Sequence, residues 1–89
     1  MAGRTTDRPA WTMVMWAQQA TMIGWVIAEC AKALGRRVPA PVRKGREFAE
    51  VCGGAADAVF ASATNIADLK GRYPDALRAA IAAAESRFA

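Results

Sequence analysis

The chain has 89 residues, a formal net charge of +4 and no histidine. Hydrophobic residues make up 54% of the sequence, and they comprise 22 alanines, two cysteines and 24 large apolar side chains. A chain of this length forms one small domain whose single core is only just adequate. Without histidine the commonest general base and metal ligand are missing. We therefore expect no enzymatic activity, no cofactor, no metal and no small-molecule substrate.

The segment 11–28 carries no formal charge, and its length is close to the minimum for a membrane span. However, Gln18 and Gln19 lie in its middle, and Glu29 and Lys32 follow it closely. The two glutamines also interrupt the apolar stretch that a signal peptide needs. We therefore expect a buried helix of a cytoplasmic protein with no membrane contact.

The first helix is expected over 9–34, with Asp7 as its cap and Pro9 in its first turn. The residues before it, 1–8, are polar and are expected to form a flexible N-terminus ahead of a single helical domain over 9–89. Spacings of three and four residues predict the buried seam of this helix. The seam consists of Met13, Trp16, Ala20, Ile23, Ile27, Cys30 and Leu34.

A loop over 35–41, which contains two prolines, separates this helix from a second one expected over 42–70. A third helix is expected over 74–88, with the apolar face Leu77, Ile81, Ala84 and Phe88. The predicted seam of the second helix consists of Phe48, Cys52, Ala55, Val59, Ser62, Ile66 and Leu69. These elements predict an all-α fold, a long antiparallel helical hairpin plus a shorter third helix, in which the three-helix bundle is completed by oligomerisation.

Small residues in the second helix predict a close contact with a neighbouring helix. Gly53 and Gly54 each cost about 1 kcal/mol relative to alanine in an exposed helix, so some packing advantage should offset them. Gly54, Ala58 and Ser62 repeat every four residues and form a smooth strip.

The two cysteines, Cys30 and Cys52, occupy seam positions on facing helices. They are predicted to be small buried thiols, at levels that do not match well enough for a disulfide.

Eleven of the 24 large apolar residues fall within 11–34, so the first helix is apolar around most of its circumference. Two alternatives follow. Its tryptophans fill a monomeric core, or Trp11, Met15, Met22 and Trp25 lie at an interface with a second copy or another protein. We favour the interface, and therefore a homo-oligomer or a hetero-complex.

The positive charge is concentrated in one part of the sequence. The segment 32–46 carries six cations and no acid, whereas 47–69 carries four acids and no cation. The residues of interest around the inter-helix loop are Arg36, Arg37, Arg43, Lys44 and Arg46. This basic corner is either a solvated turn or a contact for nucleic acid or another acidic partner.

The sequence thus favours a non-enzymatic accessory or assembly subunit. In this interpretation it docks through its Trp/Met-rich first helix and contacts nucleic acid or an acidic partner through the basic corner. The alternative is a purely protein–protein adaptor, inhibitor or phage structural component that makes no contact with nucleic acid.

Overall fold

The computed structural model describes residues 8–89, and this part of the chain is all-helical, with five helices and no strand. The predicted all-α class is confirmed. The helices are α1 (Met13–Ala33), α2 (Ala40–Arg43), α3 (Arg46–Phe60), α4 (Ile66–Gly71) and α5 (Tyr73–Phe88). The predicted cap Asp7, and all but the last residue of the predicted flexible segment 1–8, lie outside the described residues.

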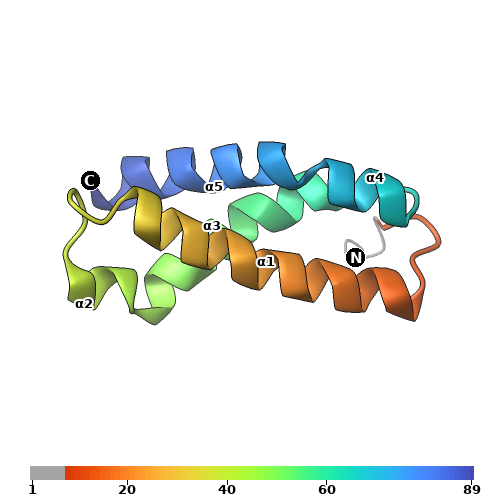
Figure 1. Ribbon diagram of the computed structural model, residues 1–89, viewed down its shortest axis with the longest axis horizontal. Helices are drawn as coiled ribbons and strands as arrows, with labels where there is room; N and C mark the ends of the chain where they lie inside the picture. The colour runs from red at the N-terminus through yellow and green to blue at the C-terminus, as the bar shows by residue number, and fades with distance from the viewer. Residues whose placement is uncertain (1–7) are drawn as a thin grey trace, which may run out of the picture.

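The three longer helices, α1, α3 and α5, contact one another pairwise. Figure 1 shows that α1 and α5 run in the same direction along the long axis, while α3 runs back between them. The short helices lie at opposite ends, with α2 beside the start of α3 and α4 immediately before α5. The result is a flat body of 40 × 29 × 17 Å.

Helix α1 begins at Met13 rather than at residue 9, so the predicted start is wrong. The side chain of Thr12 caps it by accepting a hydrogen bond from the backbone N–H of Met15 at 3.2 Å. Ala10 has a positive φ of 35°, which interrupts helical geometry just before this cap. Proline at position 9 therefore belongs to a turn ahead of the helix.

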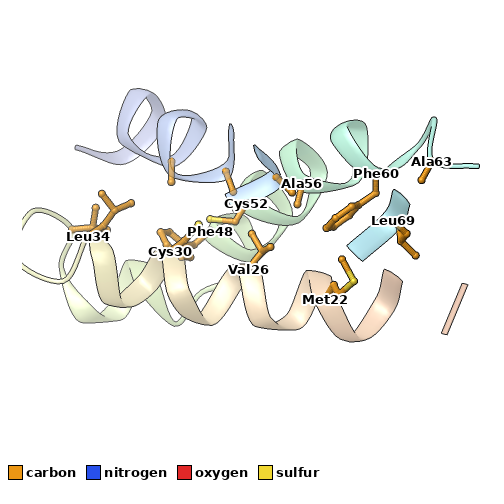
Figure 2. Close-up of a cluster of buried hydrophobic side chains, with 14 of the residues drawn as sticks. Met22, Val26, Cys30, Leu34, Phe48, Cys52, Ala56, Phe60, Ala63 and Leu69 are labelled. Atoms are coloured by element: carbon orange, nitrogen blue, oxygen red, sulfur yellow. The ribbon is translucent and has the colours of Figure 1, made fainter. Parts of the chain in front are cut away.

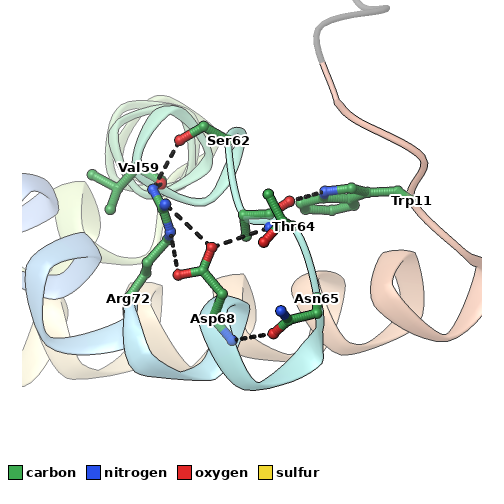
Figure 3. A network of polar contacts seen from close by, with 8 residues as sticks. Trp11, Val59, Ser62, Thr64, Asn65, Asp68 and Arg72 are labelled. Atoms are coloured by element: carbon green, nitrogen blue, oxygen red, sulfur yellow. Dashed lines mark hydrogen bonds and ion pairs between the residues drawn. The ribbon is translucent and has the colours of Figure 1, made fainter.

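The helix predicted over 42–70 is wrong, because the chain forms α2, α3 and α4 in its place. Side chains in the break over 61–65 take over backbone hydrogen bonds that a continuous helix would use. Asn65 accepts from the backbone N–H of Asp68 at 2.8 Å, and the Asp68 carboxylate accepts from that of Thr64 at 3.1 Å (Figure 3). The spacing Asn65-x-x-Asp68 is a helix-start signal that the hydrophobic pattern concealed.

Arg72 holds the end of α3 against the start of α4. Its guanidinium donates to the carbonyl of Val59 at 3.1 Å, to the hydroxyl of Ser62 at 2.8 Å and to the carboxylate of Asp68 at 3.1 Å (Figure 3). The hydrogen bonds from Arg72 and from the backbone of Thr64 keep the pKa of Asp68 below its usual value. The break is therefore an ordered connection with specific polar contacts.

The buried face of α1 differs from the predicted seam over its first turns, whereas Cys30 and Leu34 at the end of that seam are buried as predicted. Met13 is 86% exposed and Trp16 is 47% exposed, whereas the buried residues of this helix are Met15, Gln19, Met22, Val26 and Cys30. The helix is rotated relative to the prediction because several of its faces are apolar enough to be buried. Hydrophobic spacing alone could not select among these faces.

Alanines on α5 let large side chains from the other helices fill the core. The buried residues of α5 are Ala76, Ala80 and Ala84, and those of α3 are Phe48, Cys52, Ala56 and Phe60. Figure 2 shows these α3 side chains facing those of α1. The larger residues predicted on the third helix, such as Leu77 and Ile81, are only partly buried and flank the alanines.

The close approach between α1 and α3 uses Gly53 and not the predicted strip that begins at Gly54. A Cβ at Gly53 would lie 3.4 Å from Cγ2 of Ile23, whereas a Cβ at Gly54 would meet nothing within 4 Å. Ala58 and Ser62, the other members of the strip, are also exposed.

These two glycines allow a direct test of the packing. We expect Gly54→Ala to raise the free energy of unfolding by about 1 kcal/mol, because alanine is favoured over glycine inside a helix by that amount. Gly53→Leu should lower it, because atoms beyond the added Cβ would clash with Ile23. Urea denaturation followed by circular dichroism measures both changes. A loss of stability in Gly54→Ala would contradict this assignment.

Candidate functional site

The structure does not bring the four predicted interface residues together on one surface. Met15 and Met22 are buried in the chain's own core at 3% and 2% exposure. Trp11 is partly buried, and its indole N–H donates to the carbonyl of Ala63 at 2.7 Å. Of the four, only Trp25 is mainly in solvent, at 55% exposure.

The exposed apolar surface of α1 is made by a different set of residues. Among the described residues, the exposed large hydrophobic side chains are Met13, Val14, Trp16 and Trp25. Exposed positions among these residues and one turn beyond them carry small side chains. They are Ala17, Ala20, Thr21, Gly24 and Ala28. We call these nine residues the outer face of α1.

The outer face is shaped for close contact with another element. A Cβ at Gly24 would meet nothing within 4 Å, so its backbone is open to solvent. Small side chains allow the backbones of two helices to approach closely, and the larger residues on either side can then pack against the neighbour. None of the nine residues is charged, so covering this face would leave no buried charge unpaired.

Arg8 makes contacts that the sequence did not reveal, and they hold the chain ahead of α1. The guanidinium of Arg8 lies 4.6 Å from the ring centroid of Trp11 and 4.9 Å from that of Trp16. It also pairs with Asp57 of α3, whose carboxylate accepts a second hydrogen bond from the side-chain amide of Gln19. Sequence patterns could not assign partners to Asp57, because Arg8 and Gln19 lie 49 and 38 residues away from it in the chain.

Within the basic corner the five cations have different roles. Arg37 pairs with Glu85 of α5, and Nε of Arg43 donates to the carbonyl of Val38 at 2.8 Å. Arg36, Lys44 and Arg46 are exposed and make no ion pair with any residue of 8–89. Two of the predicted binding residues therefore stabilise the fold, and three remain available to a partner.

The two cysteine thiols lie beside each other between α1 and α3, so the predicted mismatch in their levels is wrong (Figure 2). Both are free and fully buried. Burial, with a smaller contribution from Cys52, raises the pKa of the Cys30 thiol from 9.0 to about 12. Burial also raises the pKa of Cys52. Reactive cysteines have lowered pKa values and partial exposure, so this pair is chemically inert in the folded protein.

This pair predicts an alkaline loss of stability. In the unfolded chain the thiols ionise near pH 9.0, whereas the folded Cys30 ionises near pH 12, so folding opposes ionisation. The free energy of unfolding should be level from neutral pH to pH 9 and fall as the pH rises from 9 toward 12. Cys30→Ala should make the fall in the free energy of unfolding between pH 9 and 10 shallower. This range lies below the usual pKa of Tyr73, 10.0, which burial raises further, so Tyr73 contributes little there.

Denaturation at a series of pH values measures this dependence, and thiol labelling gives an independent check. Both cysteines should react with an aromatic disulfide reagent only when the chain unfolds. Rapid labelling of the folded protein at neutral pH would contradict the assigned burial.

No family model, curated protein or solved structure matches the chain. Within residues 8–89, no helix combines the length and apolar character that a bilayer crossing requires. The same part of the chain has no group of three or more histidine, cysteine or acidic side chains placed to hold a metal ion.

Proposed function

We propose that this protein is a non-enzymatic helical assembly module that docks through the outer face of α1. The observation that carries the proposal is the concentration of all the large exposed hydrophobic side chains among the described residues on this one helix. Contiguous apolar patches on small proteins commonly mark interaction sites. The partner that we propose is a second copy of the chain, with its helix completing the bundle.

The packing of the outer face supports a helix as the contacting element. Ala17, Gly24 and Ala28 line its centre, while Trp16 and Trp25 stand on either side. A helix laid along the small residues would run between the two tryptophans, which lie on opposite sides of α1. The free thiols Cys30 and Cys52 favour a reducing compartment, and we place the assembly in the cytoplasm.

Gly24→Leu tests this docking surface. The added side chain meets nothing in the isolated chain, so the fold should be retained, but it would hold a second helix away from the centre of the outer face. We expect self-association to weaken about tenfold or more, which corresponds to about 1.4 kcal/mol. Sedimentation velocity across the micromolar range measures the association.

Gly54→Leu is the matched control, because Gly54 is equally open but lies on α3. It should leave association unchanged. A wild-type chain that stays monomeric throughout this range, or an equal loss in the two variants, would contradict docking through α1.

A second candidate function, contact with nucleic acid, is favoured by the three unpaired cations of the basic corner. Arg36 follows the end of α1, Lys44 follows α2, and Arg46 begins α3. A cation at a helix N-terminus is electrostatically unfavourable, and a bound phosphate would compensate for the position of Arg46. The alternative, a purely protein–protein adaptor, needs no such contact.

The number of available cations limits the salt dependence of this binding. Neutralising three phosphates gives a slope of about −2.7 in log affinity against log salt concentration. The variant combining Arg36→Glu, Lys44→Glu and Arg46→Glu should abolish binding to duplex DNA without loss of helix content. Fluorescence anisotropy at several salt concentrations measures the slope. No binding by the wild type at low salt would eliminate this candidate and leave the adaptor.

A further inference from the structure

A groove of about 680 Å³ lies between α1 and the junction of α4 with α5. Sites for small molecules commonly have volumes of about 300–1,000 Å³, apolar walls and a few polar groups. It is lined by Gln18, Met22, Trp25, Ala28, Glu29, Lys70 and Tyr73.

Two aromatic rings form the apolar walls of the groove. The ring centroids of Trp25 and Tyr73 lie 6.4 Å apart at an interplanar angle of 74°, so the rings meet almost at a right angle. Buried Met22 also lines the groove. Because Trp25 is 55% exposed, an apolar group placed against this packed ring pair would remove a large aromatic surface from water.

Two charged residues line the groove, the acid Glu29 and the cation Lys70. Glu29 is engaged by Nζ of Lys32 at 3.5 Å. Lys70 is exposed and makes no ion pair within the described part of the chain, 8–89. The side-chain amide of Gln18 supplies a further hydrogen-bond donor. The cation left without a partner is therefore the Lys70 ammonium.

We propose that this groove binds a small apolar carboxylate, with its body against Trp25 and Tyr73 and its carboxylate on the Lys70 ammonium. The molecule is a ligand and undergoes no reaction here. This proposal goes beyond the docking function, since binding to the single chain needs no second copy. The groove shares Trp25 and Ala28 with the outer face of α1, so a docked copy and the ligand would compete for that edge. Lys70 lies outside the outer face, so the charge preference tested at Lys70 holds or fails separately from association through Gly24.

Three probes of the same shape and different charge test the proposal on the full chain. Phenylbutyrate carries the carboxylate, phenylbutyramide is neutral, and phenylbutylamine carries an ammonium. Titration into the ¹⁵N-labelled protein, followed by two-dimensional NMR, reports both affinity and location. We expect phenylbutyrate to bind most tightly and phenylbutylamine most weakly, with shifts centred on the Trp25 indole and the amides around Lys70 and Tyr73.

Substitution at Lys70 separates the charge contact from apolar binding. Lys70→Gln should weaken phenylbutyrate binding about three- to fivefold, the size expected for a partly exposed charge pair, and leave phenylbutyramide unaffected. Lys70→Arg should retain the preference for the carboxylate. Arg78→Gln is the control of equal charge change, because Arg78 is an exposed cation of α5 outside the groove.

Several results would overturn the proposal. Equal affinity for phenylbutyrate and phenylbutyramide would exclude a charge contact with Lys70. Chemical-shift changes scattered over the surface would exclude the groove as the binding site. Equal losses in Lys70→Gln and Arg78→Gln would show a general effect of net charge. Trp25→Ala should weaken all three probes, and unchanged binding in that variant would place the apolar body elsewhere.

Discussion

The other helices of this short chain bury only one face of its most apolar helix, α1. This limit determines which apolar residues remain exposed. Residues 11–34 hold eleven of the 24 large apolar side chains, yet α3 and α5 cover only one side of α1. The remaining side of α1 therefore faces solvent with four large hydrophobic residues. The core is completed instead by alanines on α5, which add little apolar area themselves but let large side chains from α1 and α3 approach closely.

The sequence was sufficient to predict the fold class and the third helix. Gly35 and the two prolines of the 35–41 loop place the end of α1 to within two residues, and Pro74 lies in the first turn of α5. These positions are predictable because glycine and proline act through their own backbone, independently of tertiary contacts. The break over 61–65 was also encoded locally, by Asn65 and Asp68, but an apolar pattern that continues across it concealed the signal.

The rotation of α1, in contrast, could not be predicted from spacing. Met13 and Trp16 satisfy the same periodicity as Met15 and Met22, so hydrophobicity does not distinguish the two faces. The structure buries Gln19, a residue that the hydrophobic pattern excludes from any seam. The candidate interface depended on this rotation, and for that reason two of its four predicted residues lie in the core.

A polar network accompanies the rotation that the hydrophobic pattern leaves undetermined. Gln19 is buried on the same side of α1 as Asp57 of α3, and the Asp57 carboxylate accepts from both Gln19 and Arg8. Turning Trp16 inward instead would move Gln19 away from Asp57 and leave the acid without one of its donors. Because the Asp57 side chain is 39% exposed, water would replace that donor, so the network contributes only modestly to the observed rotation.

The same rotation determines which surface of α1 is exposed. With Gln19 directed inward, Gly24 and its small neighbours face outward, and Trp25 stands beside Tyr73 at the groove. A substitution of Gln19 that turned α1 would therefore change both proposed surfaces, the outer face and the groove, through one cause. Changes at Gly24 or Lys70 would act on each surface separately, because both positions are exposed and make no core contact.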